Sequence, residues 1–488
     1  MKNYSKILAA IFIFSMSGCD ILDPQPISDI SSENFFQSAE HVEAAMSATY
    51  DVLQSNSIGR DFKASATAGS DEADTDPGSG GNNNRMNRHE VNADHGPARD
   101  LWRELYQGIH RANDILERLP GVSDPALEIN NKREQLLGEA HFLRGFFYWN
   151  LAKWYGDVPI ILQTTTSSDP DVLNVERDPL PEVYDQIIAD LTFAEANLPE
   201  SYETNQFTRG RATTGAAAAV LSKVYLRRAY TEFAGSNDFE MAAASAQRVI
   251  DNPNYSLVAP QDFFSMFAAD GGNTVESIFE IQTENIELNS GDDLYREFEA
   301  SENGPRARAR IIPNQKLIDA YNANPGDIRK DAVLKPMDPA QNSGFEFYIN
   351  KHDVGEGQLI PNLVILRLAD IILVRAEALN AIGQTPEAIN LLNMIRDRAQ
   401  IGNTTATTPD EVFQAIQDER FVELAFEGHR WHDLSRFPAN NFEWGRNELA
   451  TAAEVSFMDE NQTYQFLWPI NNRELDINKN LRQNPGYN

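Results

Sequence analysis

The densest group of residues that could carry chemistry lies between residues 418 and 433. Its carboxylates are Asp418, Glu419, Glu423, Glu427 and Asp433. Glycoside hydrolysis needs two carboxyl groups that face each other across a cleft. The three glutamates instead recur every four residues, so a helix would stack them along one face, within reach of Arg420 and Arg430. We therefore interpret this segment as a set of structural ion pairs, and an all-helical glycosidase is the weaker alternative.

Two further groups resemble parts of metal sites. His429 and His432 are three residues apart and Asp433 follows, a spacing that suits zinc on a helix. No third histidine lies nearby at a matching spacing, so the sequence predicts no metal there. Residues 72–78 (EADTDPG) resemble the start of a calcium loop, but Pro77 occupies the position of the required turn glycine. An EF-hand is thereby excluded, an adventitious calcium ion stays an open alternative, and no cofactor is predicted.

Helices must hold these groups in place, and apolar residues recur along the chain at spacings of three and four. This pattern predicts four helix pairs, at about residues 39–119, 134–197, 213–251 and 365–399. The last pair has Gly383 at the end of its first helix, which is expected to carry Ile365 on its apolar side, and a proline in the first turn of its second. These features resemble tetratricopeptide helix pairs. The other pairs are spaced irregularly, so periodicity alone does not predict an uninterrupted solenoid.

The stretch from Glu139 to Tyr155 (EAHFLRGFFYWNLAKWY) is the most aromatic of these helices. A helix with so many rings must be covered on most sides. Its predicted core residues are Phe146, Tyr148, Trp149 and Trp154. Gly156 follows the last periodic residue and is expected to stop the helix in left-handed backbone.

Two regions lack long helical periodicity. Residues 55–97 are rich in Gly, Asn, Asp and Ser and are predicted to form a long loop. Residues 252–362 are predicted to form an irregular insert with short strands at 277–281 and 345–349. After them, a capping box at 408–411 (TPDE) is expected to open a further helix.

Composition and charge limit the class of protein. Hydrophobic residues make up 41% of the 488 residues, which is ample for a large core and excludes global disorder. The formal net charge of −32 argues against nucleic acid and anionic membrane surfaces as partners. The sequence therefore predicts a mainly all-α protein, with one helical domain at 33–488 that carries long irregular loops and a few short strands.

The N-terminus has the features of an exported lipoprotein. A positively charged start precedes an apolar run at 7–16, which is too short to span a bilayer as a mature helix. Small residues then precede Cys19, the single cysteine of the chain, and this arrangement resembles a bacterial lipobox. The resemblance implies a signal peptide at 1–18, diacylglyceryl and N-acyl (palmitate) modification of Cys19, and a tether at 19–32. A plain signal peptide with an incidental cysteine is the alternative.

Motifs spread over nearly the whole chain resemble the SusD/RagB family of outer-membrane nutrient-binding lipoproteins from Bacteroidota. Each motif alone is weak, but their order and spacing together are specific. They are Leu22-Asp23-Pro24, RGFFYWNLAKWYGDVPI at 144–160, IFEI at 278–281, LRLADIILVRAEALN at 366–380, ERFVELAFEGHRWHDLSRF at 419–437, LWPINNREL at 467–475 and QNPGY at 483–487.

The resemblance implies a scaffold of four tetratricopeptide-like helix pairs with loops packed on one side. It also implies a non-catalytic protein that is lipid-anchored in the outer membrane and faces outward. Its role would be to bind a glycan and deliver it to a SusC-like TonB-dependent transporter, as part of polysaccharide utilisation. The same fold binding peptides or another non-sugar nutrient is an alternative interpretation.

In the family, ligand contacts come largely from two loop segments, which correspond here to residues 55–97 and 283–310. The resemblance therefore implies ligand-binding roles for Asn84, Arg85, Asn87, Tyr295, Phe298 and Arg306. The first segment has almost no aromatic residues, which departs from the aromatic platform expected of a starch binder.

The second segment carries arginines at 306, 308 and 310. Guanidinium groups suit carboxylate or sulfate groups on a ligand. Pairing with the protein's own acids at 297, 299 and 302 is the favoured interpretation.

Overall fold

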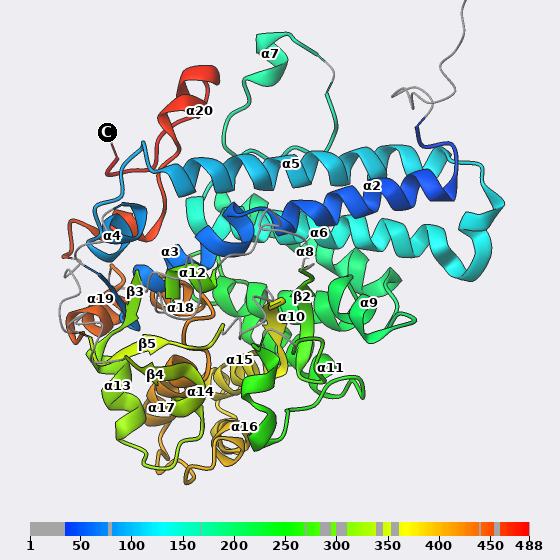
Figure 1. Cartoon of the computed structure of the whole chain (residues 1–488). Coiled ribbons are helices and arrows are strands. Elements are labelled where there is room, and N and C mark those ends of the chain that lie inside the picture. The colour runs from blue at the N-terminus through cyan, green and yellow to red at the C-terminus, as the bar shows by residue number, and fades with distance from the viewer. Residues whose placement is uncertain are drawn as a thin grey trace, which may run out of the picture.

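Helices account for most of the residues that the structure describes, and apolar periodicity predicts the longest of them (Figure 1). The computed structural model describes residues 35–76, 81–165, 167–268, 271–283, 294–298, 310–337, 345–352, 361–438, 441–452 and 459–487. The signal segment, Cys19, the tether and Arg306 lie outside these residues. Within the described residues, no helix is both long and apolar enough to cross a bilayer.

The scaffold helices lie within the ranges of the four predicted pairs, except that α6 begins two residues earlier, at Lys132. They are α2 (Ala39–Asp51) with α5 (Gly96–Arg118), α6 (Lys132–Tyr155) with α8 (Leu180–Asn197), α10 (Thr214–Arg228) with α11 (Asp238–Ile250), and α15 (Leu368–Ala381) with α16 (Thr385–Arg398). Each helix packs against the next one in this order, from α2 and α5 at one end to α15 and α16 at the other (Figure 1). The prediction of a mainly all-α fold is therefore confirmed.

A further helix, α17 (Pro409–Glu423), packs against both members of the last pair. It opens with the predicted capping box. The Glu411 N–H donates to Thr408 Oγ1, and Glu411 Oε2 accepts from the Thr408 N–H at 3.0 Å. The two contacts satisfy backbone donors that the first turn of a helix leaves unpaired.

α6 lies in the middle of the scaffold and buries the aromatic residues predicted for the core. Its predicted core rings are all at most 7% exposed. α5, α8 and α10 pack against it, and Gly156 ends it with a φ of 74°. The closest approach is at Gly108 of α5, where a Cβ atom would lie 2.4 Å from the ring of Phe147.

The strands form two-stranded antiparallel sheets within the described residues. The pairs are β1 (Ala73–Thr75) with β3 (Ile311–Pro313), β2 (Ser277–Ile281) with β6 (Leu363–Arg367), and β4 (Leu334–Pro336) with β5 (Phe347–Ile349). The strand predicted at 277–281 is confirmed, and the one predicted at 345–349 begins later, at Phe347. Ile365 lies on β6 and not on a helix, so its predicted place is wrong. β6 ends at Arg367 and α15 begins at Leu368 with no connecting residue, and apolar residues flank Arg367 on both sides, which hides the boundary.

Shorter helices lie in the two regions predicted to be irregular, between the longer helices and after α17. They are α3 (Phe62–Ala68), α4 (Asn82–Asn87), α7 (Pro170–Leu173), α9 (Asn205–Gly210), α12 (Tyr295–Phe298), α13 (Gln315–Asn322), α14 (Arg329–Val333), α18 (Arg430–Leu434), α19 (Glu443–Ala450) and α20 (Asn472–Ile477). A π-helical turn lies at Ser57–Asp61, and 3-10 turns lie at Val52–Gln54, Leu119–Gly121, Pro125–Asn131, Pro260–Asp262, Phe264–Met266 and Thr463–Phe466.

The prediction of one long loop at 55–97 is therefore wrong. α3 has the sequence FKASATA, and every residue after its phenylalanine is buried. A helix that is covered on all sides by close neighbours has no polar stripe, so apolar periodicity does not reveal it. Small side chains allow this close packing.

Candidate ligand-binding site

The two segments implied to carry ligand contacts meet on one side of the molecule, around α4, α12 and β3 (Figure 1). β1 pairs with β3, and the Asp76 N–H continues the ladder by donating to the Arg310 carbonyl at 2.9 Å. We call this surface the loop junction. It comprises residues 73–76, 82–88, 294–298 and 310–313.

Glu297 links the two segments through its side chain. Its Oε2 accepts from Asn83 Nδ2 at 2.9 Å, and its Oε1 lies 3.2 Å from Arg310 Nη1. The prediction that arginines of the 306–310 series pair with the protein's own acids is thereby confirmed for Arg310. Arg306 and Arg308 lie outside the described residues.

The predicted ligand contacts occupy different environments. Asn84 and Asn87 are buried, and their amide groups are paired inside the protein. Thr75 Oγ1 donates to Asn84 Oδ1, and Asn87 Nδ2 donates to the Ala68 carbonyl at 3.2 Å. Their amides hold the inside of the first segment together. Arg85, between them on α4, is exposed.

The second segment shows a similar division. Tyr295 begins α12, while Phe298 at its end is completely buried, with its ring stacked on His352 at a centroid distance of 5.7 Å. Of the predicted contacts whose side chains the structure describes, Arg85 is therefore the one that faces solvent at the loop junction. The assignment of the whole set to ligand binding stays a prediction.

A buried network of ion pairs stabilises the loop junction. Arg430 of α18 holds Asp71 with two contacts of 2.7 Å, and Lys316 of α13 pairs with the same carboxylate. Glu448 of α19 accepts from both cations. Although burial raises the pKa of Asp71, the charges of Arg430 and Lys316 hold it well below its usual range. The network therefore ties the start of β1 to three separate elements.

Glu72, the first residue of the calcium-like stretch, is unsuited to a cation. It is 1% exposed, Oε2 accepts from the Phe426 N–H at 3.1 Å, and Oε1 has no partner in the described residues. Burial, reinforced by the neighbouring charge of Asp71, raises its pKa to about 8. A carboxyl group that holds its proton more tightly than usual is a poorer calcium ligand than an ionised one, since calcium prefers charged oxygens.

The three glutamates of the 418–433 segment form buried ion pairs, as the sequence predicts, but with other partners. Arg329 binds Glu419 at 2.6 Å and Glu423 at 2.9 Å. Arg367 binds Glu423 at 2.6 Å and Glu427 at 2.7 Å. The predicted pairing of the three glutamates with Arg420 and Arg430 is wrong, since Arg420 binds Asp370 and the segment's own Asp433, while Arg430 binds Asp71 and Glu448.

The predicted helical stacking is also only partly right. α17 ends at Glu423, and a turn with positive φ at Phe426 and Gly428 precedes α18, so Glu427 lies outside the helix. These glutamates point at buried cations and not across a cleft. No group of three potential metal ligands gathers anywhere in the described residues, the neighbourhood of His429 and His432 included.

A second surface, which the sequence patterns did not predict, has the chemistry of sugar recognition. A groove of about 390 Å³ runs between α2, α9 and β2, and we call it the α9 groove. Its lining includes Gln54, Gln206 and Phe207, and the Phe207 ring is 51% exposed. An exposed ring beside amide groups suits a sugar, which presents a C–H face and hydroxyls. The sequence pattern that could have predicted this groove is weak, because Gln206 and Phe207 lie on a helix of less than two turns.

Two protein-family models match the chain. One, described as the SusD family, matches residues 342–487, and the other, described as starch-binding associating with outer membrane, matches residues 20–226. SusD-like protein P2 of Formosa agariphila is 29% identical over the full length of both chains, and SusD-like protein P38 of the same organism is 25% identical.

Solved structures share the fold. A laminarin-binding SusD-like protein is 25% identical, with a TM-score of 0.73 over 92% of this chain and 100% of that one. A SusD homologue from Bacteroides thetaiotaomicron is 22% identical and has a TM-score of 0.80 over 93% of this chain and 98% of that one. The second likeness concerns the fold alone.

Proposed function

Because this chain belongs to the SusD/RagB family, we propose that it is a non-catalytic glycan-binding subunit at the outer membrane. It captures an oligosaccharide and delivers it to a SusC-like TonB-dependent transporter. A lipid on Cys19 anchors it, with the binding surface facing outward. The ligand is enclosed when this protein docks on the transporter, so tight binding by this chain alone is not required.

The observation that carries this proposal is the loop junction. Two segments more than 200 residues apart in sequence are paired through β1 and β3 and cross-linked through Glu297. Backbone pairing and buried charges hold this surface on a rigid scaffold, which favours binding by limiting the entropy lost on association. The name of the laminarin-binding relative supports a polysaccharide as the ligand class.

The alternatives are weaker. A glycosidase needs one protonated and one ionised carboxyl group beside the substrate. The acid-rich 418–433 segment instead directs its central glutamates, Glu419 and Glu423, to buried arginines. A peptide ligand on the same fold stays an alternative, because an exposed arginine and amide groups also suit peptide carbonyls and carboxylates.

The test is a binding assay with soluble laminarin, starch and a pool of oligopeptides, by isothermal titration. We expect wild-type protein to bind at least one glycan and no peptide. Arg85→Ala should weaken glycan binding about tenfold or more if the loop junction is the contact surface, which corresponds to loss of a hydrogen bond to a charged group. Phe207→Ala should instead weaken glycan binding if the α9 groove is the contact surface.

Arg248→Ala is the matched control, because Arg248 lies on α11 with its side chain 47% exposed and pairs only with Glu195 and Ser245 among the described residues. It should leave glycan affinity unchanged. Binding of peptides with no glycan binding would overturn the proposal. Hydrolysis of any glycan would overturn its non-catalytic part.

A further inference from the structure

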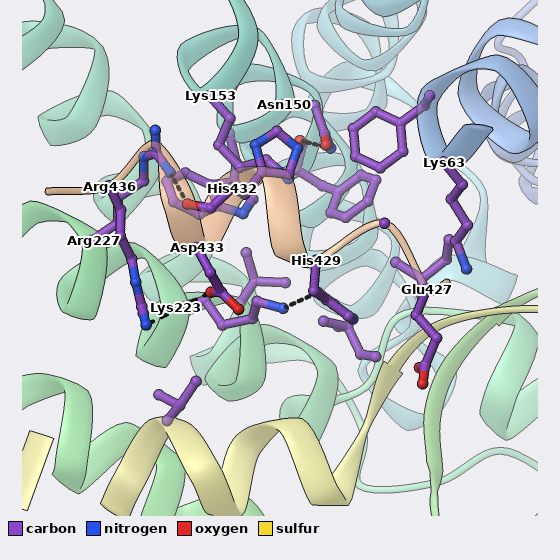
Figure 2. Close-up of a pocket in the computed structure, with 18 of the residues that line it drawn as sticks. Lys63, Asn150, Lys153, Lys223, Arg227, Glu427, His429, His432, Asp433 and Arg436 are labelled. Carbon is purple, nitrogen blue, oxygen red and sulfur yellow. Dashed lines mark hydrogen bonds and ion pairs between the residues drawn. The ribbon is translucent and has the colours of Figure 1, made fainter. Parts of the chain in front are cut away.

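A cavity of about 80 Å³ lies in the middle of the helical scaffold (Figure 2). Side chains from α5, α6 and α10 line it together with the segment that contains α18. Its polar lining includes Lys153, Lys223, Arg227, His429, His432 and Asp433. None of its lining residues belongs to the loop junction or to the α9 groove. It is therefore a separate feature of the molecule.

Lys153 of α6 brings an amino group into this cavity without a counter-ion. It makes no hydrogen bond or ion pair with any residue that the structure describes. Its Nζ instead lies over the rings of Phe62 and Trp149, 5.1 Å and 5.3 Å from their centroids. Aromatic faces stabilise an ammonium group, but they accept no conventional hydrogen bond from it. The three N–H donors of a protonated Lys153 thus lack an acceptor within the described chain.

The neighbouring cations are not balanced by the cavity's own acids either. Arg227 of α10 donates to the His432 carbonyl at 2.9 Å and to Ser435, and to no carboxylate among the described residues. Asp433 is already held by Arg420 at 2.9 Å, and Glu427 by Arg367 and Lys351. Lys223 pairs with Asp370 behind the cavity wall. The cavity therefore has an excess of positive charge.

His432 supplies a second unsatisfied donor. Its side chain is 9% exposed, and neither ring nitrogen has a hydrogen-bond partner in the described residues. Its ring packs against Trp154 and Phe62, at centroid distances of 4.9 Å and 5.7 Å. Burial, together with the charge of Lys153, lowers the pKa of His432 well below its usual value, so the ring is neutral. A neutral imidazole still carries one N–H, and leaving it unpaired in the interior is costly.

We propose that this cavity binds a small anion of single charge, such as chloride or a short carboxylate, between Lys153 Nζ and a ring N–H of His432. The volume suits an ion of this size with a few waters and excludes an oligosaccharide. Aliphatic side chains of Leu105, Val220 and Val374 complete the wall and strengthen the attraction by excluding water.

The bound anion has a structural consequence. Lys153 lies on α6 and His432 on α18, so the ion bridges the scaffold and the segment that pairs with Asp71 under the loop junction. Burial lowers the pKa of Lys153 well below its usual value, and a neighbouring anion raises it again by favouring the charged form. A ligand that binds only the folded state raises stability with its concentration. We therefore expect small anions to raise the unfolding temperature of this protein specifically, beyond the general effect of salt.

Two measurements on the full-length folded protein test whether the cavity binds a small anion. Wild-type crystals soaked in sodium bromide should show an anomalous peak inside the cavity. At constant ionic strength, replacing sodium gluconate, whose anion is too large, with 100 mM sodium chloride should raise the unfolding temperature by about 2–4 °C. Lys153→Met, which keeps the length of the side chain but removes the ammonium group, should lose this rise.

Lys479→Met is the matched control, since that lysine is 67% exposed, and it should keep the wild-type response. If Lys153→Met does not fold, the bromide peak in wild-type crystals decides the question. A cavity without a bromide peak, combined with equal unfolding temperatures in chloride and gluconate, would overturn the proposal. Lys153 would then be a neutral amine facing water.

Discussion

Glu72 is a single buried carboxyl group beside the loop junction that makes the stability of the fold depend on pH. Its pKa is raised to about 8 by burial and by Asp71, against an ordinary value of 4.5. Because the folded state holds this proton more tightly than the unfolded state, the contribution of Glu72 to stability is fully present below about pH 4.5 and falls as pH rises toward 8. This carboxyl group therefore weakens the fold in alkaline solution.

Glu72→Gln should remove that dependence, because the amide keeps an oxygen for the Phe426 N–H and cannot ionise. We expect the free energy of unfolding to exceed the wild-type value by about 2 kcal/mol or more at pH 9, relative to pH 5, in urea titrations. Glu240→Gln, at an exposed position of α11, should follow the wild-type curve. If the free energy of unfolding changed with pH in the same way in wild-type and Glu72→Gln proteins, the raised pKa of Glu72 would be contradicted.

At the scale of the elements, the packing of α5 on α6 depends on the absence of a side chain at Gly108. A Cβ atom there would lie 2.4 Å from Phe147 Cε2, well inside van der Waals contact. Alanine gains about 1 kcal/mol of helix propensity over glycine. Overpacking a dense core costs about 1–3 kcal/mol, so the loss should prevail.

We therefore expect Gly108→Ala to be destabilised by about 1–2 kcal/mol in urea denaturation. Gly121→Ala is the control, since a Cβ atom added there would have no described atom within 4 Å and the φ of this glycine is not positive. It should change stability by less than about 0.5 kcal/mol. Equal stability of the two variants would mean that α5 and α6 separate more easily than their packing suggests.

The elements also show what the sequence can and cannot predict. α6 and α15 have long apolar patterns, so their presence follows from local residues alone. α3 is covered on all sides and β1 has three residues, so neither has a pattern long enough to detect. Their formation depends on segments that are distant in sequence, as when β1 pairs with β3.

The same limit applies to the candidate site. The resemblance identified the two segments that meet at the loop junction, but not which side chains face outward. Asn84 and Asn87 have the residue type of ligand contacts, yet Thr75 and backbone carbonyls occupy their amides. In the 418–433 segment, charge pairing was predictable from composition. The partners Arg329 and Arg367 were not, because they approach only in the folded chain.

At the scale of the whole molecule, charge is divided between surface and interior. The chain has a formal net charge of −32, yet many of its arginines are buried against glutamates and aspartates. Removing one partner from such a pair leaves a buried charge and is strongly destabilising. The interior network therefore fixes how the helix pairs and the loop elements assemble, while the excess acid on the surface maintains solubility.

The anchor should be independent of this assembly, because Cys19 precedes the helical domain in sequence. We predict that Cys19→Ser abolishes labelling by an alkyne analogue of palmitate and releases the protein from the membrane fraction. Its glycan affinity should match that of the wild-type domain, since no element of either candidate surface includes this cysteine. Ser17→Ala, which keeps a small residue in the lipobox, should still be labelled. Labelling retained in Cys19→Ser would refute the lipid anchor, whereas lost labelling with altered glycan affinity would show that the anchor and the binding surface are coupled.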